Sequence, residues 1–367
     1  GGRVSAHLLT HGIIHSTTDP YAQALLVRDG MIAWLGADDS ADRVADPGDE
    51  RRDLDGAVVV PVFVEPLARP ADARDALSRG TAVVTVLAGP EDTGAAPADE
   101  DVQTVVYRHA DRVDAEAAGV WLPVGTGTDP ATLAGLLTAS TQAGEQAYLV
   151  PDGGADAGPA AQDVALTALR SVAEELGTAA LGRVRHRLVV THSVTAEDRA
   201  FLAAAGVSAT VVPDADGVLH APVASLLADA VSVCLGAGPA GDPWAAVRSA
   251  LSHPDPDERI SARSAFAAAT RTPLRALPDA PAARLSVAPR LSVSAPAVFG
   301  VWDADAVAVQ SPDGRVAAWS TDTRAGTPLL PALDAETALP RWRATWVDGR
   351  IAAEDVARDA RDGATPA

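Results

Sequence analysis

Eight short apolar runs constrain the fold of this chain more than any other feature. Strands that are apolar along their whole length are typical of parallel sheets covered on both faces. Most of the runs are separated by amphipathic, helix-like segments, and eight such units indicate an α/β fold built as a (β/α)₈ TIM-like barrel. The runs lie at 57–64, 81–89, 102–108, 119–125, 146–152, 186–192, 206–213 and 230–236.

The connections between these runs predict helices of uneven quality. Asp129 and Pro130 form an N-cap with proline in the first turn, and Thr195 is placed as an N-cap three residues before Asp198. The acidic stretch 90–101 has no apolar periodicity, so we expect a loop where a barrel helix would otherwise lie. Helices are predicted at 70–80, 129–144, 159–177, 195–206, 242–253 and 261–271.

Both ends of the chain read as short strands. Asp29-Gly30, between two apolar runs, is a hairpin signal, and Asp348-Gly349 repeats it near the other end. We therefore predict one small composite β-sandwich domain made from both chain ends. The predicted division is 3–56 and 285–355 for the β domain, 57–284 for the barrel and 356–367 for a tail.

The charge excludes two classes of partner. The chain has 29 basic residues, all arginine, against 49 acidic residues, and its formal charge is −20. Nucleic-acid binding needs a basic surface that releases counterions, and anionic membranes likewise attract basic segments, so neither partner is expected. The absence of lysine also rules out a Schiff base and a carbamylated-lysine metal bridge.

Cysteine usage indicates the compartment. Cys234 is the sole cysteine and lies inside an apolar run. No intrachain disulfide can form, which fits a reducing, cytoplasmic location. The apolar setting predicts a buried, inert thiol.

Three histidines near the start suggest a metal site by their spacing of four. On a helix, His7, His11 and His15 would share one face. Gly12 and the β-branched pair at 13–14 favour a strand and a turn instead, so we do not expect these histidines to converge.

Several stretches resemble the amidohydrolase superfamily of metal-dependent hydrolases. DLDG followed by AVVVPVFVEPLAR (53–69) resembles the entry into that barrel, "DL.G..v.PGfvD.H.H". The stretches QAYLVPDGG (146–154), RHRLVVTHSVTAED (185–198) and LGAGPAGDPWAAVRSAL (235–251) resemble later strands of the branch that acts on N-acyl and N-formyl amides. The likeness covers most of the chain and is thinnest between 69 and 146.

The resemblance implies a metal site whose ligand positions can be placed on this sequence. One metal-ligand position of five keeps its residue, namely the strand-six histidine at His192, preceded by Thr191 where the motif has glutamate. Glu65 stands at the aspartate of the first motif. The two strand-one histidines, the strand-five histidine and the strand-eight aspartate are replaced by Leu67, Arg69, Pro151 and Gly238.

These replacements remove the chemistry that the resemblance implies. Metal-dependent hydrolysis needs three or four protein ligands and a base near the metal-bound water. Leucine and proline offer no side-chain lone pairs, and arginine repels a cation. We therefore expect no metal and no other cofactor.

Polar residues remain at the ends of four predicted strands, the face that carries barrel active sites. Glu65, His109, Asp152 and His192 lie there. They could form a rebuilt site, or His192 could be a hydrogen-bonded vestige while Glu65 pairs with Arg69 or caps a loop.

Three functions remain open. The first is an inactive homologue with a binding, scaffolding or regulatory role and a small-molecule ligand at the barrel mouth. The second is a hydrolase of carbon–nitrogen amide bonds with the rebuilt site, for which zinc would be the cofactor. The third is the structural subunit of a homo- or hetero-oligomer. An open polar mouth would favour ligand binding, and a plugged one would favour structure alone.

Overall fold

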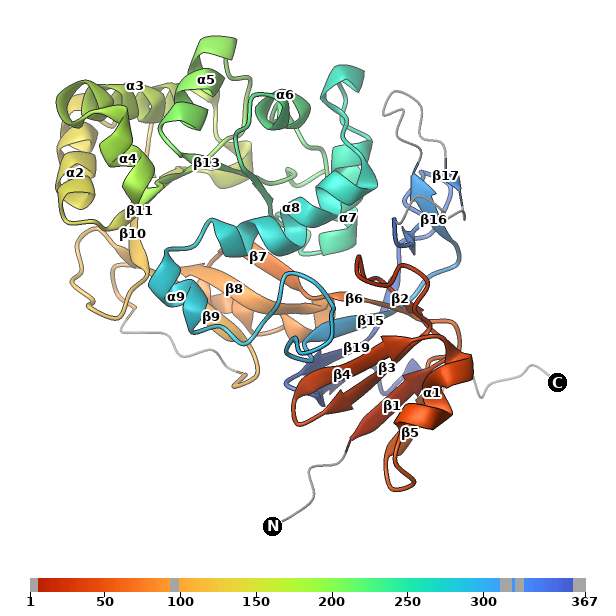
Figure 1. Cartoon of the computed structure of the whole chain (residues 1–367). Coiled ribbons are helices and arrows are strands. Elements are labelled where there is room, and N and C mark those ends of the chain that lie inside the picture. The colour runs from red at the N-terminus through yellow and green to blue at the C-terminus, as the bar shows by residue number, and fades with distance from the viewer. Residues whose placement is uncertain (1–5, 93–98, 311–318, 321–326, 359–367) are drawn as a thin grey trace.

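The chain forms a barrel with a smaller β domain beside it (Figure 1). The computed structural model describes residues 6–92, 99–310, 319–320 and 327–358. Part of the acidic stretch 90–101, at 93–98, and the tail beyond 358 lie outside the described residues. In the described part, none of the helices combines the length and the apolar composition that a membrane crossing needs.

The predicted (β/α)₈ barrel is confirmed. Eight strands form one parallel sheet in sequence order, and its end strands β7 and β14 contact each other, so the sheet is nearly closed. The strands are β7 (Phe63–Ala68), β8 (Thr81–Leu87), β9 (Gln103–His109), β10 (Gly119–Val124), β11 (Gln146–Pro151), β12 (Arg187–Val189), β13 (Ser208–Val211) and β14 (Val233–Leu235).

The apolar run 57–64 is not one barrel strand, and this corrects the sequence reading. Its first part, β6 (Val58–Pro61), pairs with β2 (Ile13–Ile14) and β15 (Phe299–Asp303) in the small domain. The barrel strand β7 begins only at Phe63. Both parts are buried, so the apolar sequence alone does not distinguish one long strand from two strands in different sheets.

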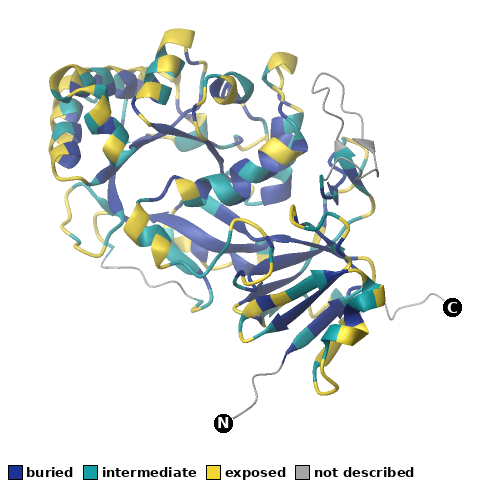
Figure 2. Cartoon of the chain, viewed as in Figure 1, coloured by how far each residue is buried: buried dark blue, intermediate teal, exposed yellow. Residues whose placement is uncertain are grey.

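Five predicted helices are confirmed, two of them with their predicted N-caps. Asp129 accepts a hydrogen bond from the Thr132 amide at the start of α2, and Thr195 accepts one from the Asp198 amide at the start of α5. Buried faces alternate with exposed ones along these helices (Figure 2). They are α2 (Pro130–Gln142), α3 (Pro159–Leu176), α5 (Ala196–Ala204), α7 (Pro243–Leu251) and α8 (Ala262–Arg275), joined by the shorter α4 (Thr178–Val184), α6 (Val223–Ala228) and α9 (Asp279–Ala283).

The helix predicted at 70–80 is wrong. The segment forms two 3₁₀ turns, η1 (Pro70–Ala73) and η2 (Leu77–Arg79). The second turn packs against strands β19 and β20 of the small domain, and Ala76 and Leu77 are buried there. The β domain therefore occupies the place where a barrel helix would lie. The segment 70–80 has an amphipathic sequence because its apolar residues are buried against the β domain.

The small β domain combines strands from both ends of the chain. Two sheets, in the orders β4-β3-β1-β5 and β2-β6-β15-β19-β20, share one apolar core in which Phe299 stacks on Trp346 at 5.5 Å. The predicted hairpin turn at Asp29-Gly30 is present, with positive φ at both residues. The remaining bounds are β1 (His7–Thr10), β3 (Ala24–Arg28), β4 (Met31–Gly36), α1 (Asp38–Val44), β5 (Glu50–Asp53), β19 (Arg341–Val347) and β20 (Arg350–Glu354), with a third sheet of β17 (Trp319–Ser320), β16 (Val307–Gln310) and β18 (Leu330–Pro331).

The barrel interior holds a buried arginine that the sequence did not single out. The Arg187 guanidinium lies 4.3 Å from the centre of the Tyr148 ring, and its Nη1 donates to the Tyr107 hydroxyl at 3.3 Å. Its Nε and Nη2 have no hydrogen-bond partner among the described residues. Nearby Cys234 is fully buried, and burial raises the pKa of its thiol, as expected for an inert cysteine.

The burial of the Arg187 guanidinium without a carboxylate beside it leads to a stability prediction. Because a buried charge without a carboxylate partner is unfavourable, we expect R187M to raise the free energy of unfolding by about 1 kcal/mol. The measurement is urea unfolding followed by circular dichroism. R185M is the matched control, because Arg185 donates to two backbone carbonyls and its loss should destabilise by about 1 to 3 kcal/mol. If R187M destabilised as much as R185M, the contacts of Arg187 with Tyr107 and Tyr148 would outweigh the cost of burying its charge.

Candidate functional site

Two adjacent cavities open at the carboxyl ends of the barrel strands. Their volumes are about 360 and 350 Å³, and Leu67, Ala68, Asp72 and the pair at 153–154 line both of them. The first cavity is also lined by Glu65, Arg79, Asp156 and the segment 237–241. The second is also lined by Arg69, Trp121 and Asp152. The mouth is therefore open and polar.

Glu65 joins the first and last strands of the barrel. It lies on β7, and its carboxylate accepts hydrogen bonds from the Leu67 amide at 3.3 Å and the Ala237 amide, just after β14, at 3.0 Å. A Cβ at Gly236 would lie 2.8 Å from Glu65 Oε1, so glycine permits this approach. The sequence left two structural roles open for Glu65, an ion pair with Arg69 and the capping of a loop. The structure shows that Glu65 caps the loop after β14.

The environment of Glu65 changes its acidity. Burial disfavours the charged carboxylate and raises its pKa to about 7, although the two amide donors and the Arg79 charge act in the opposite direction. A carboxyl group with this pKa exchanges protons near neutral pH, which suits a general acid or base. Glu65 is therefore a candidate general acid or base in the first cavity.

The residues that the sequence resemblance aligns with metal-ligand positions have structural contacts of their own. The Arg69 guanidinium lies 4.7 Å from the centre of the Trp121 ring, and Leu67 packs beside the same apolar cluster. Pro151 is buried at the end of β11. Gly238 has a φ of +72°, and a Cβ there would lie 2.6 Å from the Pro213 carbonyl oxygen. None of these four side chains can donate a lone pair to a metal.

His192 is held from its own loop and from α3. Its Nδ1 shares a hydrogen bond with the Thr191 hydroxyl at 2.8 Å. The Gln162 side-chain oxygen on α3 accepts from the amides of both residues, at 3.0 and 3.1 Å. His192 lines neither mouth cavity.

His109 faces a third cavity. It shares that cavity with Asp92, Asp111 and Asp114, and its Nδ1 accepts from the Asp111 amide at 3.2 Å. Its ring packs edge-on against Trp121 at 5.2 Å. Of the four residues proposed for a rebuilt site, the structure places Glu65 and Asp152 in neighbouring cavities and the two histidines elsewhere.

The donor set does not fit zinc. A catalytic zinc site uses three protein ligands and an open position. Within the described ranges, no group of three or more histidine, cysteine, aspartate or glutamate side chains is arranged to hold a metal ion. His7, His11 and His15 accordingly do not converge either.

Sequence reasoning missed three residues of the first cavity. Asp72 and Arg79 lie in the segment 70–80, for which the sequence predicts a helix, and Asp156 follows two glycines with positive φ at 153 and 154. The glycine pair at 153–154 was the one sequence feature that pointed to Asp156. Glycine-rich loops allow the backbone to come close to a ligand.

Comparisons with known proteins show which fold this is. No family model matches the sequence, and no curated protein matches it. The structure is similar to N-isopropylammelide isopropylaminohydrolase from Burkholderia multivorans, with a TM-score of 0.60, 14% identity and coverage of 96% of this chain and 99% of that one.

Two further solved structures agree. Atrazine chlorohydrolase from Arthrobacter aurescens, complexed with zinc, gives a TM-score of 0.62 at 15% identity, with 97% of this chain and 98% of that one covered. D-hydantoinase gives 0.53 at 16% identity, with 95% of each chain covered. All three are amidohydrolases, and at this identity the shared property is the fold. The likeness in fold extends over nearly the whole chain.

The raised pKa of Glu65 predicts how stability depends on pH. The folded-state pKa of about 7 exceeds the reference value of 4.5, so the folded state holds this proton more tightly than the unfolded state. The resulting stabilisation is complete below pH 4.5 and is lost as the pH rises through 7. We expect the difference in unfolding free energy between wild type and E65Q to fall by on the order of 2 to 3 kcal/mol between pH 4.5 and pH 8.

Urea unfolding across this pH range measures the effect. D152N is the control, since it removes a carboxyl group from the neighbouring cavity and leaves Glu65 in place, so the Glu65 step should persist. A difference between wild type and E65Q that stayed constant with pH would show that Glu65 titrates normally.

Proposed function

We propose that this chain, which has the amidohydrolase fold, does not carry out zinc-dependent hydrolysis and acts by binding a small molecule at the barrel mouth. One observation carries the proposal. Four of five ligand positions hold side chains that cannot coordinate a metal, while the cavities beside them remain open and polar. A scaffolding or regulatory role, including one within a homo-oligomer, follows from the same loss of chemistry.

The first cavity indicates the kind of ligand. Its volume of about 360 Å³ lies within the range of small-molecule pockets, about 300 to 1,000 Å³. Carboxyl groups of Glu65, Asp72 and Asp156 line it together with the single cation Arg79. A small polar molecule that presents N–H or O–H donors, such as an amine or amide, fits this lining.

A second candidate function rests on Glu65 alone. A carboxyl group of pKa about 7 that lines a cavity could transfer protons to and from an amide without a metal. Such a hydrolase of carbon–nitrogen bonds would use Glu65, with Asp152 in the neighbouring cavity. The histidines of the rebuilt site would lie outside these two cavities.

Metal content tests the first proposal directly. After incubation with zinc and dialysis, we expect the protein to retain well under about 0.1 equivalent of zinc by plasma mass spectrometry, because three ligands are needed for tight binding. H192A and the surface control H220A should give the same value as wild type. Retention of about one equivalent that H192A abolishes and H220A preserves would refute the loss of the metal site.

Activity distinguishes the two functions. With a panel of N-formyl and N-acyl amides, we expect no hydrolysis above the buffer rate. The second candidate instead requires a rate that changes with a midpoint near pH 7 and falls by about 100-fold or more in E65Q, the range for loss of a general acid or base. D152N shows whether the neighbouring carboxyl takes part.

A further inference from the structure

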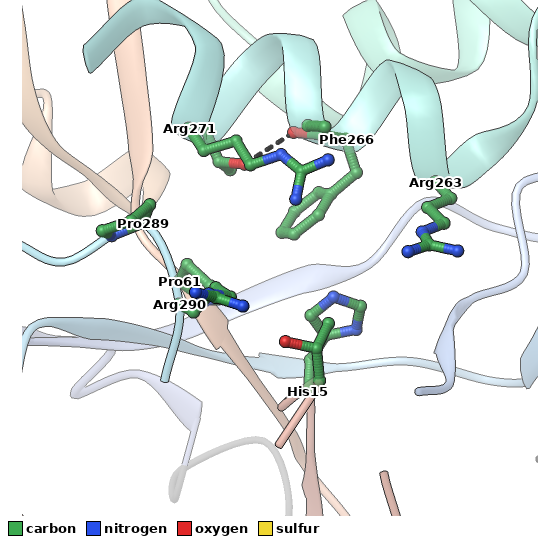
Figure 3. Close-up of a pocket in the computed structure, with 10 residues that line it drawn as sticks. His15, Pro61, Arg263, Phe266, Arg271, Pro289 and Arg290 are labelled. Carbon is green, nitrogen blue, oxygen red and sulfur yellow. Dashed lines mark hydrogen bonds between the residues drawn. The ribbon is translucent and has the colours of Figure 1, made fainter. Parts of the chain in front are cut away.

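A separate cavity lies between helix α8 and the small β domain (Figure 3). It shares no lining residue with the mouth cavities and has a volume of about 50 Å³. Its wall contains three arginines and one histidine, and no aspartate or glutamate lines it. The lining residues are His15, Thr17, Pro61, Arg263, Phe266, Ala267, Thr270, Arg271, Pro289 and Arg290.

Three distant segments bring the arginines together. Arg263 and Arg271 lie two turns apart on α8, with the small residue Ala267 between them on the same face. Arg290 comes from the loop before β15, and His15 follows β2. Figure 3 shows these side chains around one space, with the Phe266 ring between the α8 arginines.

Among the described residues, no carboxylate neutralises the positive charge of this cavity. Within the described ranges, none of these three arginines forms an ion pair, although other arginines, such as Arg108 and Arg170, pair with carboxylates at 2.6 and 2.5 Å. Burial, followed by the charges of Arg275, Arg263 and Arg290, lowers the pKa of Arg271. Such a cluster is unexpected in a chain of formal charge −20, where acidic partners are abundant.

His15 contributes a neutral wall. Its Nδ1 donates to the Leu329 carbonyl at 3.0 Å, and its ring packs edge-on against Phe266 at 5.2 Å. Burial lowers its pKa to about 4, so the imidazole is uncharged at neutral pH. The positive charge therefore comes from the guanidinium groups alone.

The helix dipole accounts for only part of the arrangement. A cation near the last turn of α8, where Arg271 and Arg275 lie, is favourable because the carbonyl end carries negative partial charge. Arg263 lies in the first turn, where the same dipole disfavours a cation, and Arg290 is not on the helix. The helix dipole therefore does not account for the positions of Arg263 and Arg290.

We propose that this cavity binds a compact oxyanion, the phosphate or carboxylate group of a small molecule, through Arg263, Arg271 and Arg290. Guanidinium groups bind both kinds of oxyanion with paired, charge-assisted hydrogen bonds. The volume of about 50 Å³ admits a group the size of a few waters and excludes a nucleotide base within the cavity. Because its walls come from the barrel and from the β domain, the bound anion would link the two.

Calorimetric titration of the full chain with inorganic phosphate, at ionic strength held constant with chloride, tests the proposal. We expect saturable binding and a raised melting temperature. R271Q should weaken binding by about tenfold or more, because it removes a charge-assisted contact. R271K, which keeps the charge but loses the planar fork, should fall between R271Q and wild type. R248Q is the matched control, because Arg248 is a half-buried helix arginine that lines none of these cavities.

Parallel titrations with sulfate and acetate identify the group that binds. Preference for phosphate and sulfate assigns a phosphate-type ligand, and preference for acetate assigns a carboxylate. The double variant R263Q/R290Q provides a second test on exposed residues whose loss should not affect folding, and it should also weaken binding. The proposal is overturned if wild type binds none of the three anions, or if R271Q and the double variant bind them as R248Q does.

Discussion

The closure of the barrel between its first and last strands is the constraint on which the rest of this structure depends. The described strands β7 and β14 contact each other without forming a ladder, so other groups must hold the seam. Helix α8 packs on both strands. The ring of Phe266, on α8, packs against the rings of Phe63 on β7 and Trp244 on α7. At the mouth, the Glu65 carboxylate connects the strands through the Ala237 amide.

This closure links the two candidate binding sites. Glu65 holds the seam at the barrel mouth and also lines the first cavity there. Phe266 packs on Phe63 at the seam and on His15 in the arginine-lined cavity. Helix α8 therefore packs across the two end strands of the barrel and also forms one wall of the arginine-lined cavity. A ligand in that cavity would contact the helix that holds these two strands together.

The residues at the mouth that the resemblance aligns with metal-ligand positions are held by packing contacts. Arg69 now packs on Trp121, and Gly238 occupies a position where a side chain would collide with the Pro213 carbonyl. The charged groups that remain, Glu65, Asp72 and Arg79, surround space on one side of the mouth.

The sequence by itself determined the barrel and the composite β domain. Apolar periodicity reports which residues are buried, and caps such as Asp129 and Thr195 act within one turn of chain, so both can be predicted locally. Only the tertiary structure decided that 57–64 serves two sheets, that Glu65 reaches Ala237, and that Arg263, Arg271 and Arg290 share one cavity. The physical reason is that burial is encoded locally, whereas the partner of a charged side chain is supplied by segments far apart in the chain.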